Sequence, residues 1–312
     1  MWYWIVIAVI LLQVPLGSFI CFYKTFYVPT RKEPKTIEDR LPPGPIYKPY
    51  YPRMKEWIAD LDTMPYEAIN ITSFDGLTLR GRYYELDPDS PVEILFHGYR
   101  GWAERDMCGA VQRCFAVGHS ALLVDQRAGG RSDGHVITFG VKESRDVPVW
   151  MQAVTDRFGK ERKIILTGIS MGATTVMLAA GNPLPQNVIG VLADCGFSTG
   201  EGIIKKVMND MGFPPFPLYY LLRLGAKMFG GFDIEKVNCP AALAKATVPI
   251  LFFHGEDDDF VPCEMSRENY AACAAPKRLI TIPGAGHGLC YPYDEEGYIN
   301  AVREFDAEYW RK

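Results

Sequence analysis

The sequence predicts an α/β protein with a mostly parallel central sheet, helices on both faces and a small insertion, preceded by one apolar N-terminal helix. Short apolar runs alternate with longer helix-compatible runs over most of the chain. This alternation is typical of a parallel sheet that is covered on both sides. In addition, a glycine-flanked serine and three glycine-containing turns each follow an apolar run, where the carboxyl ends of parallel strands meet.

The composition is that of a globular protein. Of the 312 residues, 48% are hydrophobic and 22% are charged, which is enough for a sizeable core. The formal net charge of -4 argues against a general nucleic-acid binder, because no basic excess is available to neutralise phosphates. The eight cysteines include no C-x-x-C pair, which excludes the usual zinc-ribbon and thioredoxin spacings. We expect most of them to be buried apolar residues.

The first element is an uncharged apolar segment, residues 2–23. It is long enough to span a bilayer as a helix, and aromatic residues at both ends suit the membrane interfaces. A cleaved signal peptide is the alternative, but no basic residue precedes the apolar run. Lys24, Arg31, Lys32 and Lys35 follow the run, so the positive-inside rule predicts a single-pass anchor with a cytoplasmic main domain.

Residues 24–60 are predicted to be a linker, and residues 61–312 the main domain. Six prolines between residues 29 and 49 favour an extended, stiff spacer. In the main domain, the hairpin signal Asp75-Gly76 joins the first two strands into an antiparallel edge. The predicted strands are 66–72, 77–85, 92–96, 121–124, 164–167, 188–193, 249–253 and 278–282. The predicted helices are 103–117, 143–158, 171–180, 265–274 and 295–310.

Residues 197–247 interrupt this alternation. The segment lies between two predicted strands, where a simple crossover needs far fewer residues, and it contains the cluster Phe213-Pro214-Pro215-Phe216-Pro217 and further aromatic residues. We expect it to form a small lid over the site, which would favour an apolar acyl or aryl group in the substrate. An irregular crossover with no role at the site is the alternative.

The candidate nucleophile is Ser170, in the pentapeptide Gly168-Ile169-Ser170-Met171-Gly172. A serine between two glycines, at a strand-to-helix turn, is presented above the sheet as a reactive hydroxyl. The glycines are needed because side chains two residues from the serine would clash in so tight a turn. A serine hydroxyl still needs a base, a group that orients the base, and donors for the oxyanion that forms.

The candidate base and oxyanion donors follow two other strands. His287 lies in a glycine-rich turn after predicted strand 278–282 and is the candidate base. The turn after strand 92–96 starts with His97-Gly98, and the backbone amides of Tyr99 and Met171 would form a two-donor oxyanion hole. His97 is assigned a structural role, because His287 has the more suitable location.

The acid that orients the base would follow strand 249–253, where Glu256, Asp257, Asp258 and Asp259 are consecutive. One of them should accept the Nδ1 proton of the histidine and fix its tautomer. A run of acids is usually a solvated loop, and the spacing alone does not choose among the four.

Taken together, the elbow, the His-Gly turn and the order serine, acid, histidine resemble the α/β-hydrolase superfamily over roughly residues 66–310. Residues 125–132, Asp-Gln-Arg-Ala-Gly-Gly-Arg-Ser, look like the family's D-x-R-G-x-G-x-S turn, from which only Ala128 departs. Residues 254–262 resemble the family's H-G-x-x-D-x-x-V-P motif, and this resemblance selects Asp258 as the acid, with Asp257 and Asp259 as alternatives. The chain looks most like membrane-anchored or cytosolic serine hydrolases with a short lid, near the prolyl-oligopeptidase-like and esterase-like groups.

The resemblance implies a serine hydrolase that cleaves an ester-type acyl bond through a Ser170–His287–Asp258 triad and an acyl-enzyme. It implies no metal and no cofactor. The expected partners are a small-molecule acyl substrate and, through the N-terminal helix, a membrane, but no nucleic acid. The dehalogenase chemistry of related proteins is disfavoured, because its aspartate nucleophile is replaced by Ser170.

Two other functions stay open at this point. A serine exopeptidase or amidase of the same fold would need a charged pocket for a peptide terminus. Arg100, Glu104 and Arg105 are candidates for that pocket, although solvated charges at the start of a helix explain them better. A membrane-tethered binding module without chemistry is the third hypothesis.

Overall fold

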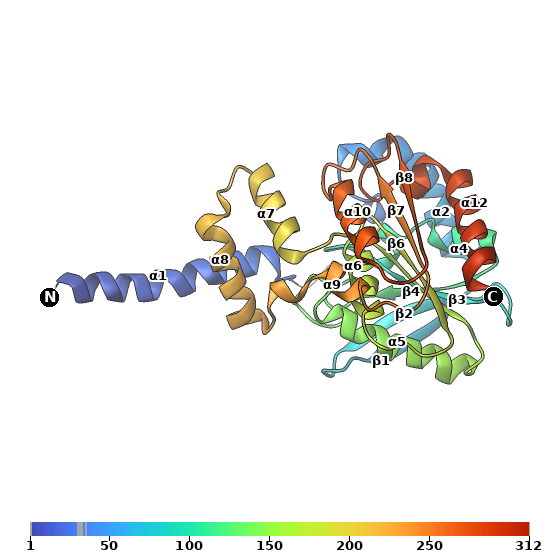
Figure 1. Ribbon diagram of the computed structural model, residues 1–312, viewed down its shortest axis with the longest axis horizontal. Coiled ribbons are helices and arrows are strands. Elements are labelled where there is room, and N and C mark those ends of the chain that lie inside the picture. Colours follow the sequence, from blue (N-terminus) through green and yellow to red (C-terminus); the bar gives the residue numbers. More distant parts are fainter. Residues whose placement is uncertain (1, 30–33, 35, 312) are drawn as a thin grey trace.

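The computed structural model describes residues 2–29, 34 and 36–311, without the side chains of residues 5–12. Its centre is an eight-stranded sheet with the order β1-β2-β4-β3-β5-β6-β7-β8. Only β2 among these strands runs against the others, because it pairs antiparallel with both β1 and β4. Figure 1 shows the sheet between two layers of helices. The predicted mostly parallel sheet with an antiparallel edge is therefore confirmed.

The strands lie where the apolar runs predict them. The bounds are β1 (Glu67–Thr72), β2 (Thr78–Tyr84), β3 (Val92–Phe96), β4 (Ser120–Asp125), β5 (Ile164–Ile169), β6 (Val188–Asp194), β7 (Ile250–Gly255) and β8 (Lys277–Ile282). Every residue of β3, β4 and β7 is buried, as expected for central strands that are covered on both faces. Along β3 the side chains alternate, so that Ile94 and Phe96 pack on one helix layer and Leu95 on the other.

Two groups of helices cover the two faces of the sheet. On one face lie α5 (Glu143–Phe158), α6 (Met171–Ala180), α9 (Cys239–Leu243) and α10 (Cys263–Ala272). On the other lie α3 (Ala103–Asp106), α4 (Ala110–Val117), α12 (Glu295–Phe305) and the π-helical turn η5 (Asp306–Trp310). The short α11 (Cys290–Tyr293) precedes α12. The fold therefore leaves the carboxyl ends of β3, β5, β6, β7 and β8 together at one edge.

The predicted helix 103–117 is wrong in one respect, because it is split into α3 and α4. The break lies at residues 107–109, where another helix approaches. A Cβ atom at Gly109 would lie only 2.7 Å from the indole ring of Trp57. The glycine therefore allows a close contact that an uninterrupted helix with larger side chains would prevent.

The segment predicted as a linker is largely packed against the main domain. After the short 3₁₀ helices η1 (Glu38–Arg40) and η2 (Pro45–Tyr50), α2 (Tyr51–Thr63) lies over α4. Met54, Trp57, Ile58 and Leu61 of α2 are buried. Their spacing of three and four residues gives α2 one apolar face, which is why it packs instead of acting as a spacer.

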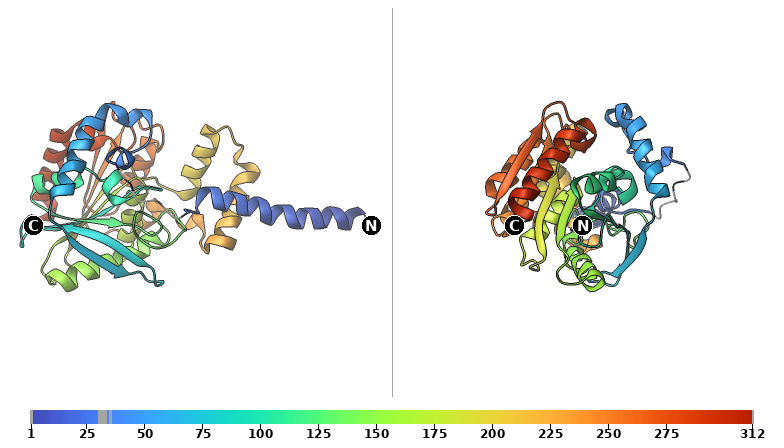
Figure 2. Two further views of the ribbon diagram at one scale, coloured as in Figure 1. Left: turned by 180° about the vertical axis from the view of Figure 1, so that it is seen from behind. Right: turned by 90° about the vertical axis from the view of Figure 1, so that its right-hand side faces the viewer.

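The apolar N-terminal segment forms the helix α1 (Trp2–Thr25). Its first turns project away from the rest of the molecule, and the C-terminus lies at the opposite end (Figures 1 and 2). Among the residues that the structure describes, no helix is both long and apolar enough to cross a membrane. The side chains of residues 5–12, the most apolar part of the predicted anchor, lie outside the described residues.

The insertion, residues 197–247, packs against α1. It contains α7 (Gly200–Asp210), α8 (Pro215–Gly225), the π-helical turn η3 (Ala226–Gly230), the 3₁₀ turn η4 (Ile234–Lys236) and α9. At Gly225 a Cβ atom would lie 2.2 Å from the carbonyl oxygen of Ser18, so the two helix backbones are in close contact. Phe19 and Phe229 add an edge-to-face ring contact with centroids 5.2 Å apart.

Candidate active site

Ser170 stands at the turn between β5 and α6, in a strained conformation. Its φ of 55° and ψ of −120° lie in a region that residues with a side chain rarely adopt. The flanking glycines are required by space. A Cβ atom at Gly168 would lie 2.2 Å from Gly172, and one at Gly172 would lie 1.9 Å from the carbonyl oxygen of Phe96. The local sequence thus fixes a sharp turn that holds the hydroxyl above the sheet.

The structure brings the three candidate triad residues into one hydrogen-bonded chain. Ser170 Oγ lies 2.9 Å from His287 Nε2, and His287 Nδ1 lies 2.7 Å from Asp258 Oδ2. When Nδ1 donates its proton to the carboxylate, Nε2 is left to accept the proton of the serine hydroxyl. The three side chains come from the ends of β5, β7 and β8, which are far apart in the sequence.

Burial distinguishes Asp258 from the other acids of its turn. Asp258 is 6% exposed, whereas Asp257 and Asp259 are exposed to solvent. Its Oδ1 accepts the backbone amides of Phe260 and Val261 at 2.9 and 2.8 Å. Burial by itself raises the pKa of this carboxyl. Hydrogen bonds from neighbouring histidines and the Val261 amide outweigh that effect and lower the pKa of Asp258 to about 2.

His254, which the motif contains without an assigned role, holds Asp258 in place. Its Nε2 lies 2.8 Å from the carbonyl oxygen of Val261 and 3.2 Å from Asp258 Oδ2. Its Nδ1 lies 2.6 Å from the hydroxyl of Ser266 in α10. The turn that carries Asp258 is therefore fixed by a buried imidazole, which sequence reasoning did not identify.

The predicted oxyanion turn lies directly beside the nucleophile. A Cβ atom at Gly98 would be 3.5 Å from the Cβ of Ser170, so only glycine lets the backbone approach so closely. No described oxygen accepts a hydrogen bond from the amide of Tyr99 or of Met171. Met171 is also the first residue of α6, where the helix dipole favours negative charge. The Gly98 amide is held by the Asp106 carboxylate at 3.1 Å.

The side chains that follow the oxyanion turn face other parts of the molecule. The Tyr99 hydroxyl donates to the carbonyl oxygen of Thr25, and Arg100 donates to that of Lys24 at 2.7 Å. Both therefore satisfy carbonyls at the C-terminal end of α1. Glu104 forms ion pairs with three arginines, Arg40, Arg82 and Arg131. Of the three charges considered for a peptide-terminus pocket, only Arg105 lines the cavity beside Ser170, and it is paired with Asp106 at 2.7 Å.

Two further predicted residues have structural surroundings. His97 is buried, and its Nε2 accepts the amide of Gln126 at 3.0 Å while its Nδ1 lies 2.8 Å from the carbonyl oxygen of Gly98. Ala128, the departure from the family's glycine, has a φ of 56°. This left-handed conformation explains why the family pattern has glycine there.

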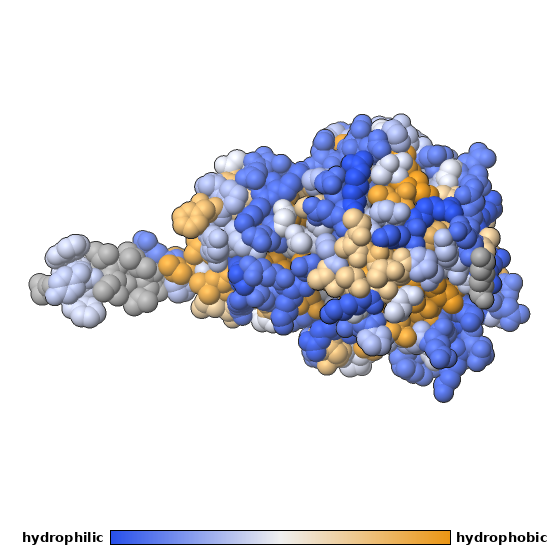
Figure 3. All heavy atoms as spheres, in the orientation of Figure 1, coloured by the Kyte–Doolittle hydropathy of each residue, from blue (hydrophilic) through white to orange (hydrophobic). Residues whose placement is uncertain are grey.

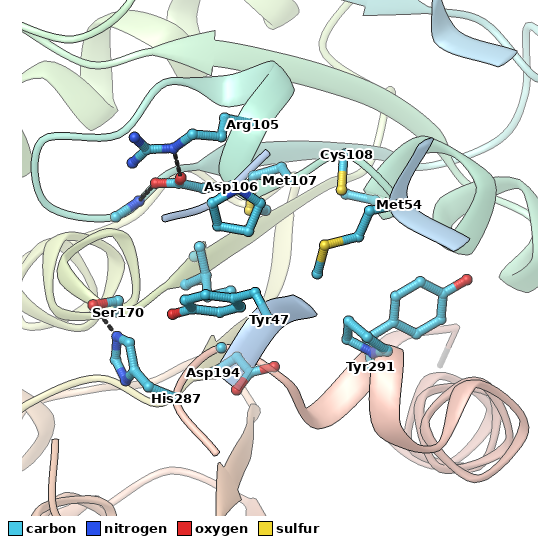
Figure 4. A pocket seen from close by; sticks show the side chains of 18 of the residues that line it. Tyr47, Met54, Arg105, Asp106, Met107, Cys108, Ser170, Asp194, His287 and Tyr291 are labelled. Carbon is cyan, nitrogen blue, oxygen red and sulfur yellow. Dashed lines mark hydrogen bonds and ion pairs between the residues drawn. The ribbon is translucent and has the colours of Figure 1, made fainter. Parts of the chain in front are cut away.

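A cavity of about 520 Å³ extends from Ser170 beneath η2 and α2 (Figure 4). Its walls are mostly apolar and include Met54, Trp57, Met107, Cys108 and Tyr291. Residues 42–47 line it as well, so we call residues 42–57 the roof segment. None of the described residues that line the cavity belongs to residues 197–247. The segment predicted as a linker thus lines the cavity, and the lid over the site stays a prediction.

Two polar side chains of the cavity were missed by sequence reasoning. Asp194, the last residue of β6, is 5% exposed, and its Oδ1 has no hydrogen-bond partner in the described part of the chain. Burial raises the pKa of Asp194. Tyr47 comes from the roof segment. Asp194 had one usable signal, its place at the end of a parallel strand, whereas Tyr47 had none, because its proline-rich surroundings read as a spacer.

One group in the described part of the chain has the spacing of metal ligands, formed by Cys195, Asp258 and His287 within 4.8 Å. It contains the acid and the base of the hydrogen-bonded chain. Burial raises the pKa of the Cys195 thiol well above its ordinary value, so the thiol stays protonated and is a poor ligand. The residues fit a proton relay better than a metal centre.

Comparison with known proteins agrees with this geometry. Residues 91–215 match the alpha/beta hydrolase fold family. A bifunctional esterase/perhydrolase of Acinetobacter calcoaceticus is 27% identical over 278 residues, 74% of this chain and 96% of the relative. The uncharacterized protein YqkD of Bacillus subtilis is 26% identical over 246 residues, 78% of this chain and 80% of the relative.

A solved esterase of Pyrococcus furiosus superimposes with a TM-score of 0.67 at 22% identity, over 92% of this chain and 99% of that structure. At this identity the likeness shows the shared fold. Together, these matches support an α/β-hydrolase superfamily member. The matched fold and the esterase relatives support a hydrolase, in which the insertion and the roof segment are additions to the α/β-hydrolase sheet.

Proposed function

We propose that the protein is a serine esterase that cleaves the ester bond of a small acyl substrate. The observation that carries the proposal is the continuous hydroxyl–imidazole–carboxylate chain of Ser170, His287 and Asp258 at hydrogen-bond distances. The mostly apolar cavity that starts at Ser170 fits an apolar acyl group. The similarity to two esterases supports the same substrate class.

In the proposed reaction, Ser170 Oγ attacks the ester carbonyl carbon while His287 Nε2 takes the hydroxyl proton. The amides of Tyr99 and Met171 donate to the oxyanion of the tetrahedral intermediate. Collapse breaks the bond to the leaving oxygen, which receives the proton from His287, and an acyl-enzyme remains. Water, deprotonated by His287, then releases the acid and restores the serine. Asp258 orients His287 and stabilises its protonated form throughout.

An exopeptidase or amidase of the same fold has less support. Its terminus pocket would have to use Arg100, Glu104 and Arg105, and the first two are engaged with α1 and with other arginines. A binding module without chemistry would give no reason for the strained backbone at Ser170 or for the aligned histidine.

The proposal is tested by labelling and by hydrolysis. The folded protein should form a covalent adduct with a fluorophosphonate at Ser170, and Ser170→Ala should form none. A series of p-nitrophenyl esters of increasing acyl length, measured beside aminoacyl-nitroanilides, should show ester hydrolysis that falls by about 10⁴-fold or more in Ser170→Ala. Ser144→Ala serves as a matched control. Preference for the anilides would favour the peptidase, and absence of both adduct and turnover would favour the binding module.

We also propose that α1 anchors the protein to a membrane as a single-pass helix, with the hydrolase domain in the cytoplasm. Besides the sequence pattern, fourteen of the twenty large apolar side chains that are exposed in the described part of the chain belong to α1 or to the insertion. Figure 3 shows apolar side chains gathered where α1 leaves the insertion. The full-length protein should stay in the membrane pellet after an alkaline carbonate wash, and release into the supernatant would refute the anchor.

A further inference from the structure

Tyr47 is the polar side chain that the roof segment contributes beside the triad. It belongs to η2, and its ring crosses the cavity with the hydroxyl directed toward Ser170 and His287 (Figure 4). The roof is close to the loop of the base, because a Cβ atom at Gly286 would lie 3.7 Å from Ile46. The Tyr47 hydroxyl therefore approaches the reacting centre from a segment that precedes the sheet by many residues.

The surroundings of Tyr47 keep its hydroxyl a donor. Burial raises the pKa of the Tyr47 hydroxyl, and the nearby Cys195, Asp106 and Asp258 raise it further. The phenol is therefore protonated over the whole range in which an esterase works. The Tyr47 hydroxyl donates to no other described group, whereas the neighbouring Tyr51 hydroxyl donates to the carbonyl oxygen of Pro42 at 2.8 Å.

The Tyr47 hydroxyl can therefore donate a hydrogen bond to a substrate that is bound beside Ser170. The oxyanion turn, with the amides of Tyr99 and Met171, already faces the carbonyl oxygen in the proposed reaction. The Tyr47 hydroxyl is directed toward Ser170 and toward His287 (Figure 4), and His287 must hand a proton to the leaving oxygen. We propose that Tyr47 is a further catalytic residue, whose hydroxyl donates a hydrogen bond to the leaving oxygen of the ester. This hydrogen bond would favour the hydrolysis of esters whose alcohols are poor leaving groups.

In this role Tyr47 transfers no proton, so the proton transfers of acylation stay as described above. The bond from Ser170 Oγ to the carbonyl carbon forms, the bond from that carbon to the leaving oxygen breaks, and the serine proton reaches the leaving oxygen through His287. Tyr47 keeps its own proton and shares it in a hydrogen bond while negative charge develops on the leaving oxygen. Such a bond to a charged atom is worth about 1.5–3 kcal/mol, which is roughly 10- to 100-fold in rate.

The inference rests on the proposed esterase activity, and the test separates the two. We would measure kcat/KM, which reports acylation, for Tyr47→Phe on acetate esters whose leaving alcohols span a wide range of pKa. The variant should lose about 10- to 100-fold on esters of aliphatic alcohols and little on the p-nitrophenyl ester, because nitrophenolate needs no help to leave. A plot of log kcat/KM against leaving-group pKa should therefore be steeper than that of the native enzyme.

Tyr50→Phe is the matched control, since Tyr50 belongs to the same helical turn but does not line the cavity. Its plot should coincide with that of the native enzyme. Equal losses for all leaving groups in Tyr47→Phe, or no loss at all, would overturn the role of Tyr47 while leaving the esterase intact. Unchanged fluorophosphonate labelling of Ser170 and an unchanged melting temperature would show that the variant is folded and that its nucleophile is present.

Discussion

The roof segment, residues 42–57, lines the cavity for which the sequence predicts a lid from the insertion, residues 197–247. The roof segment is proline-rich and reads as a spacer, yet it lines the cavity beside Ser170. The insertion interrupts the sheet at the expected place for a lid, yet none of its described residues lines that cavity, and it packs on α1 instead. Both segments contain prolines together with aromatic residues, and the presence of these residue types does not indicate which segment lines the cavity.

The difference lies in what each segment finds to pack against. Trp57 stacks on Tyr291 with ring centroids 5.2 Å apart, and Gly109 leaves room for its indole. This places the roof directly over the carboxyl end of the sheet. In the insertion, Phe232 packs on Phe26 of the chain that leaves α1. The position of an inserted segment in the chain therefore does not determine whether it covers the site, since its apolar partners do.

The largest expected effect on kcat is at the reacting centre, which belongs to neither segment. Asp258→Asn should lower kcat by about 10³- to 10⁴-fold. The side-chain amide of asparagine does not hold His287 in the tautomer that accepts the Ser170 proton, as the carboxylate does. Asp257→Asn and Asp259→Asn should leave kcat nearly unchanged, because both side chains are exposed to solvent. Steady-state kinetics on one ester decides this, and a large loss in either control would move the acid away from Asp258.

A smaller effect concerns the pH dependence of the free energy of unfolding. It compares Asp258, at the reacting centre, with Asp233, in the insertion. The pKa of Asp258 is lowered to about 2, below its ordinary value near 3.9. Its ionised form therefore adds about 2 kcal/mol to the free energy of unfolding above about pH 4, and this contribution is lost as the pH falls toward 2. In detergent, the free energy of unfolding of Asp258→Asn should fall less between pH 5 and pH 3 than that of the native protein.

Asp233 of the insertion is the counterpart for that experiment. The largest cause that lowers the pKa of Asp233 is the hydrogen bond from Arg223. The two side chains form a partly exposed ion pair, with Nε of Arg223 3.1 Å from Oδ1 of Asp233. Salt screens such pairs. The pH effect of Asp233→Asn should therefore fade at high salt, whereas that of Asp258→Asn should persist. Equal salt sensitivity would mean that Asp258 is not as buried as the structure has it.

The smallest effect concerns the choice of acyl chain. Met54→Ala should lengthen the cavity beneath the roof and shift the preferred acyl chain by about two carbons, since each buried methylene is worth about 0.8 kcal/mol. Met211→Ala, at an exposed position of the insertion, should leave the preference unchanged. The relative kcat/KM values of a graded ester series measure both. Met54→Leu, which keeps most of the volume, separates this shift from a loss of stability.

The parts that sequence could predict are those that local patterns determine. All eight strands follow apolar runs, and Ser170, His287 and Asp258 follow three of them, so the topology of a parallel sheet brings the three residues together. Asp258 was selected among four acids only through the family resemblance, because burial separates it from Asp257 and burial is not visible in a loop sequence. The catalytic roles of these residues stay predictions until they are measured.

The parts that sequence could not predict depend on packing between distant segments. Tyr47 and Ser170 are more than a hundred residues apart in the sequence but line the same cavity, and nothing in the proline-rich surroundings of Tyr47 indicates this. The spacing of Met54, Trp57, Ile58 and Leu61 did contain an amphipathic helix signal, which the prolines just before it obscured. The place of the insertion depends on α1, whose own packing on α8 rests on close approach at Gly225.

The most direct test of the account is a crystal structure of the full-length protein inhibited with a long-chain alkyl fluorophosphonate. We expect phosphorus bonded to Ser170 Oγ, the phosphoryl oxygen at the amides of Tyr99 and Met171, and the alkyl chain beneath the roof segment against Met54 and Trp57. An alkyl chain that lies against residues of the insertion, or an adduct on a residue other than Ser170, would contradict it.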